Sequence, residues 1–304
     1  MRILFITATR LGDAVLSTGL LDHLLRTYPG ARVTVACGPV AAGLFDRMPG
    51  RERTVIVEKQ AYDLHWLALW RRCVGTRWDL AIDLRGSATT WLLTTRKRAV
   101  MRGGRRPGHR TSHLAQVLGL DPPPLPVVWT APEDRARAEM LLPGPAAYIG
   151  LGPTANWSGK VWPAANFVAL YEGLAAQIPG GRPVVFAGSG AAERAMAAGV
   201  LAVLPNAIDL CGALSLPEAA ACLARCGLFV GNDSGLMHLA AAAGTPTLGL
   251  FGPSRADEYA PVGRCTGFVV SPGLPGAAPI ARLAVAPALD AALSLLRRAG
   301  TLAA

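Results

Sequence analysis

The sequence is poor in lysine, in aromatic residues and in uninterrupted apolar runs. Three lysines, Lys59, Lys97 and Lys160, stand against 27 arginines, so a lysine inside a motif is conspicuous here. No run of about 18 apolar residues occurs, and the sequence therefore predicts no membrane-spanning helix. The apolar run before Arg10 is too short for the core of a signal peptide. We expect a cytoplasmic protein.

The sequence also lacks the usual patterns of disulfides and metal sites. Its six cysteines form no CxxC pair and no cluster with ligand spacing, which favours a reducing compartment. Cys222 and Cys226, four residues apart in what reads as a helix, are typical of small buried hydrophobic positions. There is no Asp-x-Asp pair and no His/Asp cluster with ligand spacing, so we expect no metal and no other cofactor.

The length and the charge of the chain point to two domains of different character. At 304 residues it is long enough for two domains of roughly 150 residues. Residues 1–140 hold 21 Lys and Arg against 12 Asp and Glu, whereas residues 141–304 hold 9 against 8. Most of the excess lies in one basic run: Arg96, Lys97, Arg98, Arg102, Arg105, Arg106 and Arg110. Such a run attracts phosphates or an anionic membrane surface, and it equally fits a solvated loop. No nucleic-acid-binding motif accompanies it, so we expect no nucleic-acid partner.

Apolar strands alternate with helical patterns in both halves, which predicts an α/β fold with parallel sheets covered on both faces. The predicted strands are 3–7, 32–36, 54–57, 79–83, 147–151, 183–187, 228–230 and 247–251. The predicted helices are 14–28, 62–74, 164–177, 191–203, 235–243 and 286–299. A proline-rich stretch at 121–145, with a short helix around 133–141, reads as the connection between the halves. We therefore expect lobes at 1–143 and 144–304, with the final helix able to pack back on the first lobe.

A polar turn from Gly231 to His238 follows a predicted strand and opens an alanine-rich helix. Asp233 and Ser234 read as helix caps, and free N–H groups with the helix dipole favour an anion there. Gly235 lets a phosphate approach the backbone, and His238 would lie one turn further on an accessible face. Each residue alone also fits an ordinary capped helix.

Three more segments place polar residues after predicted strands. The segment 152–163 is not a P-loop, because Thr154 and Val161 occupy its first glycine and final Ser/Thr positions. Its Lys160 can neutralise a diphosphate or be an ordinary surface lysine. Glu193, after Gly188-Ser189-Gly190, can accept hydrogen bonds from a ribose or simply favour the helix dipole. Asp13 reads as a helix cap, although a general base is conceivable there.

In this order the motifs resemble those of the heptosyltransferases, glycosyltransferase family 9. The resemblance covers nearly the whole chain. It rests most on the run Asp233 to Ala242 with the following Gly-Thr-Pro and Phe251 to Ser254, and next on Lys160-Val161-Trp162-Pro163. The opening Arg2 to Asp13, the turn at Gly188 and the stretch 209–216 complete it. The resemblance implies a GT-B fold, in which two doubly wound Rossmann-like lobes bind the acceptor and the nucleotide-sugar on either side of a cleft.

The resemblance also implies roles for single residues. Asp13 matches the base, and Lys160 the lysine that contacts the diphosphate. Glu193 matches a ribose-binding glutamate, and Leu214 lies near the position that packs on adenine. The phosphate and sugar loop is matched by Asp233, Ser234, Gly235 and His238. The hydroxyl pair that the family carries before the lysine is replaced here by Ala155 and Asn156, with Thr154 one place earlier, and Thr154 and Asn156 are the candidates for that role.

These expectations define an inverting, metal-independent transferase. It would move a heptose or a related sugar from an ADP-sugar to a hydroxyl of an anionic glycolipid of the lipopolysaccharide-core type. Arg102, Arg105 and Arg106 are the candidate acceptor-binding residues, and the basic run would permit peripheral contact with the cytoplasmic face of the inner membrane. Two alternatives stay open: a nucleotide-sugar isomerase or epimerase of the same architecture, and a module that binds a glycolipid or a nucleotide without turnover.

Overall fold

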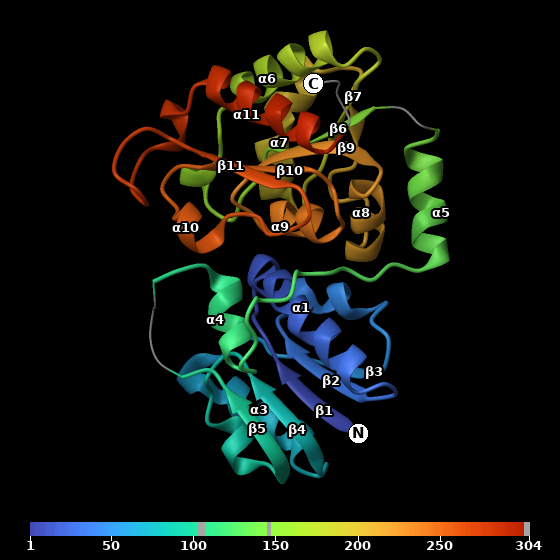
Figure 1. Ribbon diagram of the computed structural model, residues 1–304, viewed down its shortest axis with the longest axis vertical. Helices are drawn as coiled ribbons and strands as arrows, with labels where there is room; N and C mark the ends of the chain where they lie inside the picture. The colour runs from blue at the N-terminus through green and yellow to red at the C-terminus, as the bar shows by residue number, and fades with distance from the viewer. Residues whose placement is uncertain (103–106, 145–146, 301–304) are drawn as a thin grey trace. The chain divides into compact units, whose positions relative to one another are not determined.

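The structure is a computed structural model and describes residues 1–102, 107–144 and 147–300. The chain forms two compact units, Met1–Trp129 and Thr130–Ala304. Each unit is built on a parallel sheet with helices packed against it (Figure 1). The expected α/β class with two doubly wound sheets is therefore confirmed.

The first unit is centred on a five-stranded parallel sheet in the order β3-β2-β1-β4-β5. Leu4 and Ile6 of its central strand pack with Leu69 on one face, while Ile3 and Phe5 alternate with them and are buried on the other. The elements are β1 (Arg2–Ile6), α1 (Leu11–Thr27), β2 (Arg32–Cys37), α2 (Pro39–Ala42), η1 (Gly43–Phe45), β3 (Arg51–Ile56), η2 (Ala61–Asp63), α3 (Leu64–Cys73), β4 (Trp78–Asp83), η3 (Thr89–Leu92), β5 (Thr95–Val100) and α4 (Arg110–Gln116).

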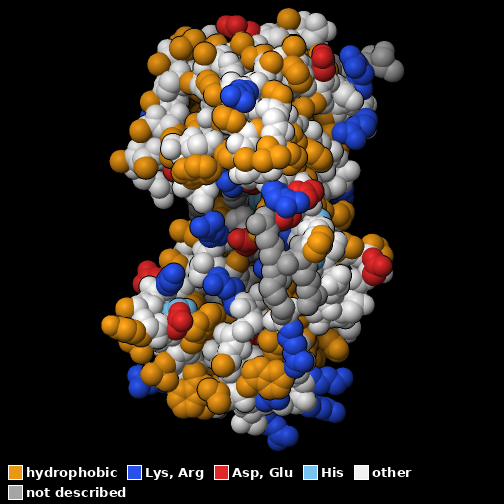
Figure 2. All heavy atoms as spheres, turned by 90° about the vertical axis from the view of Figure 1, so that its left-hand side faces the viewer, with side chains coloured by type: hydrophobic (Ala, Val, Ile, Leu, Met, Phe, Trp, Pro, Cys, Tyr) orange, Lys and Arg blue, Asp and Glu red, His pale blue; other side chains and the backbone are white. Residues whose placement is uncertain are grey.

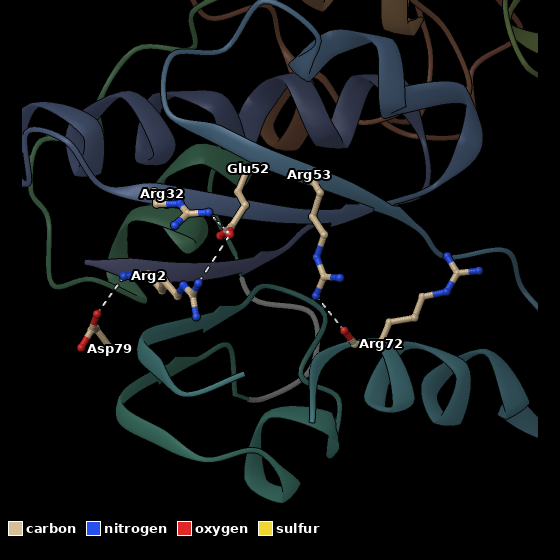
Figure 3. A network of polar contacts seen from close by, with 6 residues as sticks. All are labelled: Arg2, Arg32, Glu52, Arg53, Arg72 and Asp79. Carbon is tan, nitrogen blue, oxygen red and sulfur yellow. Dashed lines mark hydrogen bonds and ion pairs between the residues drawn. The ribbon is translucent and has the colours of Figure 1, made fainter. Parts of the chain in front are cut away.

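Polar contacts join the starts of the strands in the first unit (Figure 3). The backbone N–H of Arg2 donates to Oδ2 of Asp79 at 2.8 Å. Glu52 pairs with Arg32 at 2.5 Å and with Arg2 at 3.9 Å. These ion pairs are exposed and add little stability. They compensate part of the positive charge at the edge of the sheet where the strands begin. This edge lies opposite to the one where the strands end.

The second unit is centred on a six-stranded parallel sheet in the order β11-β10-β9-β6-β7-β8. Helices α6, α7 and α11 supply buried side chains to the core cluster on one face of this sheet. The elements are α5 (Pro132–Leu141), β6 (Tyr148–Gly152), η4 (Ser158–Lys160), α6 (Ala164–Gln177), β7 (Arg182–Val185), α7 (Ala191–Val203), β8 (Ile208–Asp209), α8 (Leu216–Leu223), β9 (Cys226–Asn232), α9 (Gly235–Ala242), β10 (Thr247–Phe251), α10 (Ala256–Tyr259), β11 (Thr266–Val270), η5 (Ile280–Arg282) and α11 (Val285–Arg298).

The second unit begins before the expected boundary at residue 143. Helix α5 packs on α8, and Glu139 of α5 forms an ion pair with Arg225, which follows α8. This packing draws the segment that we expected to be a connection into the second unit. The final helix α11 packs on α6, β10 and β11 of the same unit.

Two glycines make room for an aromatic side chain where the central strands of the second sheet end. A Cβ atom on Gly152 of β6 would lie 2.5 Å from Cζ of Phe229, and one on Gly231 of β9 would lie 2.7 Å from Cε1 of the same ring. Both distances are too short for any larger residue. Phe229 thus packs over the ends of these two strands, immediately before the loops that follow them.

The structure also contains elements that the sequence did not predict. The basic residues Arg96, Lys97 and Arg98 belong to the edge strand β5 rather than to a loop. Cys222 lies in α8, but Cys226 begins β9, so the expected shared helix is wrong. Both cysteines are buried, as expected for small hydrophobic positions.

Candidate functional site

The candidate site of the second unit lies where its parallel strands end. Strands β7, β6, β9 and β10 are neighbours, and the loops that follow them carry most of the expected donor-binding residues. Because carboxyl ends of parallel strands share one edge, these loops lie side by side. Two groups of contacts organise this edge, one around Lys160 and one around Glu193.

Lys160 is held against the loop that follows β9. Its Nζ atom lies 2.5 Å from Oδ2 of Asp233, and both side chains are largely buried. Trp162 fixes the lysine-bearing loop: its backbone N–H donates to Oδ1 of Asn232 at 3.1 Å, and its indole N–H donates to the carbonyl of Leu283 at 2.8 Å. The tryptophan in the Lys-x-Trp-Pro element is therefore an anchor that places the lysine beside Asp233.

Glu193 connects the loops that follow β6 and β7. Its Oε2 atom accepts hydrogen bonds from Oγ1 of Thr154 at 2.9 Å and from the backbone N–H of Gly188 at 2.7 Å. A Cβ atom on Gly188 would lie 2.9 Å from Oε1 of the same carboxylate, so glycine is needed for this approach. Glu193 occupies the first turn of α7, where the helix dipole favours a negative charge. The glutamate thus has a structural task whether or not it meets a ligand.

Three buried polar atoms at the same edge have no hydrogen-bond partner among the described residues. They are Nδ2 of Asn232, Oγ of Ser234 and Oγ of Ser254. Buried polar groups are nearly always satisfied in folded proteins, and those that are not indicate a place for a ligand or a water molecule. Ser254 was missed at the sequence level as a site residue, although the Phe251 to Ser254 motif was noted.

Several details of the expected donor loop are corrected by the structure. Ser234 is the N-cap residue of α9, but its side chain makes no cap hydrogen bond. Asp233 does not cap the helix either, because its carboxylate pairs with Lys160. His238 is buried in α9 rather than accessible. Asn156 is exposed, and Leu214 is half-buried just ahead of α8.

In the first unit, Asp13 lies in the first turn of α1, after the loop that follows β1. The N-cap residue of this helix is Arg10, which makes no side-chain cap hydrogen bond. Asp13 is the third residue of the helix, so its expected role as a cap is wrong. Its half-buried carboxylate lies where the helix dipole favours negative charge.

A cavity of about 260 Å³ opens at the same edge of the first sheet. It is lined by Ile6, Thr7, Thr9, Val57, Lys59, Asp63, His65, Trp66 and Arg85. The Arg85 guanidinium carbon lies 6.0 Å from the centre of the Trp66 ring, and Nη1 of Arg85 donates to Oγ1 of Thr9 at 3.4 Å. The cavity thus combines the cations Lys59 and Arg85 and the carboxylate of Asp63 with a flat aromatic wall, and none of its lining residues was named as a site residue from the sequence.

Asp83 holds the loop that carries Arg85. Its Oδ1 atom accepts a hydrogen bond from the backbone N–H of Arg85 at 2.8 Å. Its Oδ2 atom accepts from the backbone N–H of Ser87 at 2.9 Å and from the Ser87 hydroxyl at 2.6 Å. Burial raises the pKa of Asp83 above its ordinary value, and the hydrogen bonds from Ser87 and Arg85 oppose this rise. Asp83 is therefore a positioning residue for the cavity.

The three candidate acceptor-binding arginines are only partly described. Arg102 is exposed, and its guanidinium carbon lies 5.6 Å from the centre of the Trp91 ring. Arg98 of β5 lies at the same distance from that ring. Arg105 and Arg106 lie outside the described residues.

Within the described part of the chain, no group of three or more His, Cys, Asp or Glu side chains is placed to hold a metal ion. The six cysteines are free, and burial raises the pKa of Cys37 to about 12 and that of Cys73 to about 11. None of the helices described combines the length and the apolar composition needed to cross a bilayer.

Comparison with known sequences and structures agrees with the family that the motifs suggest. Residues 109–277 match the model described as glycosyltransferase family 9 (heptosyltransferase). The lipooligosaccharide heptosyltransferase 2 of Haemophilus influenzae is 27% identical over 301 residues, which cover 86% of each chain.

Two solved structures are similar over almost the whole chain. The family 9 glycosyl transferase of Veillonella parvula has a TM-score of 0.81 at 20% identity and covers 98% of this chain and 97% of that one. The ADP-heptose lipopolysaccharide heptosyltransferase II of E. coli has a TM-score of 0.78 at 22% identity and covers 99% of this chain and 100% of that one. The shared fold is the expected GT-B fold.

Proposed function

Because this chain belongs to glycosyltransferase family 9, the heptosyltransferases, we propose that it transfers a heptose from ADP-heptose to a lipopolysaccharide-core-type acceptor. The transfer would proceed with inversion at the anomeric carbon and would need no metal. The heptosyltransferase of H. influenzae, 27% identical to this chain, supports the sugar and the type of acceptor. The E. coli structure, named for ADP-heptose, supports the nucleotide.

The observation that carries the proposal is the contact between Lys160 and Asp233 beside partnerless polar atoms. A diphosphate at this edge would meet the lysine ammonium, the Ser234 hydroxyl and the first N–H groups of α9, which no side chain caps. Helix N-termini and ammonium groups both stabilise phosphate oxygens. Glu193, with Thr154, would face the ribose, and Leu214 the adenine.

Asp13 would serve as the general base. As the acceptor oxygen bonds to the anomeric carbon, the bond between that carbon and the diphosphate oxygen breaks, and the hydroxyl proton moves to Asp13. The products are ADP and the new glycoside. Negative charge grows on the departing diphosphate, where Lys160 and the start of α9 would stabilise it.

The cavity of the first unit would hold an anionic part of the acceptor. Lys59 and Arg85 outnumber Asp63 in its lining, which is therefore positive on balance, and Trp66 offers a flat face against which a sugar ring can pack. Arg102, Arg105 and Arg106 would attract the same acceptor from the basic run.

The test is transfer with the purified chain, ADP-heptose and a delipidated core acceptor, followed by mass spectrometry. We expect an acceptor heavier by one heptose and one equivalent of ADP. Donor alone should yield no isomerised sugar, whereas an epimerase would produce one. A thermal-shift comparison of ADP-, UDP- and GDP-sugars should show the largest stabilisation with the ADP-sugar, since the bound ligand stabilises the native state. Preference for another nucleotide, or no glycoside with any donor, would overturn the proposal.

A further inference from the structure

The segment 209–214 follows β8, the last strand at one end of the second sheet. In the proposed function the diphosphate lies at Lys160 and α9, after β6 and β9, and the ribose lies at Glu193, after β7. The loops that follow neighbouring parallel strands lie side by side at one edge of a sheet. A base joined to that ribose would therefore lie at the next position in the row of strands, which is the segment after β8.

Backbone hydrogen bonds lay this segment on the loop that follows β7. The N–H of Leu210 donates to the carbonyl of Val185, and the N–H of Gly212 donates to the carbonyl of Ala187, both at 3.0 Å. Gly212 has a φ of 70°, in the left-handed region, and a Cβ atom there would lie 3.3 Å from Cα of Ser189. Glycine thus allows the turn to approach the loop that leads into α7.

An ion pair ties the start of the same segment to α7. Nη1 of Arg194 lies 2.7 Å from Oδ2 of Asp209, and Oδ1 of Asp209 accepts a hydrogen bond from the backbone N–H of Cys211 at 3.0 Å. Burial opposes ionisation of Asp209, but the hydrogen bonds from Cys211 and Arg194 hold its pKa below the ordinary value. Arg194 directly follows Glu193 in the first turn of α7. Adjacent residues of one helix thus hold the proposed ribose position and the turn that leads to the proposed base position.

The other end of the segment is fixed by the cap of α8. Ser215 is the N-cap residue, and its backbone N–H donates to Oε2 of Glu218 at 2.8 Å, while its Oγ atom accepts from the backbone N–H of Glu218 at 3.5 Å. Leu214 immediately precedes this capping box and is half-buried. Its backbone is therefore held on both sides, by the turn at Gly212 and by the cap.

Charged side chains are scarce in the second unit. Residues 141–304 hold 9 Lys and Arg and 8 Asp and Glu. The face of this unit that Figure 2 shows is mostly apolar or uncharged. The ion pairs Lys160–Asp233 and Arg194–Asp209 bring four of these charges to the edge where the strands end. The second pair is used by no step of the proposed transfer.

We propose that Arg194 and Asp209 are positioning residues that give the donor site its preference for a purine over a pyrimidine base. Their ion pair fixes the turn that leads to Leu214 relative to the helix that carries Glu193. A fixed surface favours the base that fits it, whereas a mobile surface can adapt to several bases. The inference deepens the proposed function, on which it rests for the ligand's being a nucleotide-sugar.

The experiment is calorimetry with ADP, UDP and inorganic diphosphate as ligands. Asp209→Ala removes both the ion pair and the acceptor for Cys211, and it should weaken ADP binding by about tenfold. Arg194→Ala keeps the hydrogen bond to Cys211 and should weaken ADP binding by about two- to fivefold. UDP has a smaller base that gains less from contact with Leu214, so it should weaken less in both variants. The preference for ADP over UDP should therefore fall.

The two substitutions change the charge of the site in opposite directions. A purely electrostatic effect would strengthen anion binding in Asp209→Ala and weaken it in Arg194→Ala, for all three ligands alike. Inorganic diphosphate has no base and reports this effect by itself. Loss of the turn's position should instead lower the preference for ADP in both variants.

The matched control is Glu139→Ala. Glu139 pairs with Arg225, at the other end of α8, and accepts a hydrogen bond from the backbone N–H of Gly144 at 3.2 Å, so it makes the same two kinds of contact as Asp209. The control should keep the wild-type preference for ADP. All variants should melt near the wild-type temperature, because exposed ion pairs add little stability. If Asp209→Ala does not fold, Arg194→Ala decides the question.

The inference is overturned if ADP and UDP weaken by the same factor, or if both variants bind the three ligands as the control does. The ion pair would then be an ordinary surface contact. A wild-type protein without preference for ADP would instead contradict the donor of the proposed function, and the inference with it. Sugar transfer by the wild type tests that function separately.

Discussion

The Nζ atom of Lys160 lies 2.5 Å from Oδ2 of Asp233, which ties the loop after β6 to the loop after β9. The lysine charge is thus balanced by a largely buried carboxylate. A diphosphate would have to share the ammonium with Asp233 or take it over. The ammonium group of Lys160 would then stabilise the negative charge on the leaving diphosphate, while Asp233 holds the lysine side chain in place.

Replacing Lys160 by Ala should weaken ADP binding and slow turnover, because charge on the leaving diphosphate goes uncompensated. The change should also cost about 1–3 kcal/mol of stability, since it leaves Asp233 buried without its partner. Lys160→Arg should rescue turnover only in part, because a planar guanidinium replaces a compact ammonium. Calorimetry with ADP and steady-state kinetics measure these effects.

Lys97→Ala is the matched control for this variant. Lys97 is exposed on the edge strand β5 of the first unit. The control should bind ADP as the wild type does. If Lys160→Ala also binds ADP and turns over normally, Lys160 serves only as the partner of Asp233 and has no role in ADP binding or catalysis.

Asp13→Asn should lower kcat by roughly 10²–10⁴-fold, the usual range for the loss of a general base. Donor affinity should stay unchanged. Because Asp13 lies in the first turn of α1, loss of its charge should cost only about 0.3–1 kcal/mol of stability. Asp22→Asn, in the same helix, serves as the control. A wild-type kcat for Asp13→Asn would end its assignment as the base.

Helices with a strong apolar periodicity were predicted correctly from the sequence. A strand whose side chains are mostly charged was missed. Helices at 164–177 and 191–203 were located to the residue. Strand β5 was missed because Arg96, Lys97 and Arg98 give an edge strand the polarity of a loop. Residues 96–98 are all charged, so this strand shows neither the apolar run nor the alternation of apolar and polar residues that marks other strands.

The candidate site was predictable where a motif is continuous in sequence. Lys160 and Asp233 were both named, but their contact was not, since it joins residues 73 positions apart. Asp233 was taken for a helix cap because an aspartate before a helix usually is one. Arg85 and its support by Asp83 were not found, because the cavity gathers residues from three strand ends and from η2 and α3, which share no motif.

Asp83→Asn should change the pH dependence of stability. The pKa of Asp83 is raised in the folded protein, so between its ordinary value of about 3.9 and the raised value the folded protein binds more protons than the unfolded chain. The free energy of unfolding of the wild type should therefore fall as the pH rises through this window. The variant should lack this contribution, as urea titrations at several pH values can measure.

The same variant tests whether Asp83 positions Arg85. An asparagine side chain has one acceptor oxygen, whereas Asp83 accepts three hydrogen bonds through two. The loop should loosen, and the acceptor KM should rise while the donor KM stays the same. Equal changes in both constants would point to general destabilisation instead.

Turnover should persist in excess chelator, because a lysine and a helix start can stabilise the diphosphate without a metal. The measurement is the initial rate with and without EDTA after extensive dialysis. A lost rate that magnesium restores would contradict this prediction.

The basic run should act on the acceptor alone. Replacing Arg102, Arg105 and Arg106 together by Ser should raise the acceptor KM and flatten its dependence on ionic strength, because salt screens attraction between exposed charges. The donor KM should stay nearly unchanged, since the second unit carries the residues proposed to bind the nucleotide. The measurement is the KM of both substrates at several salt concentrations, with the delipidated acceptor. Wild-type values of both constants across this range would mean that the run is solvated and that the acceptor is recognised elsewhere, for which the cavity beside Arg85 is the remaining positive site described.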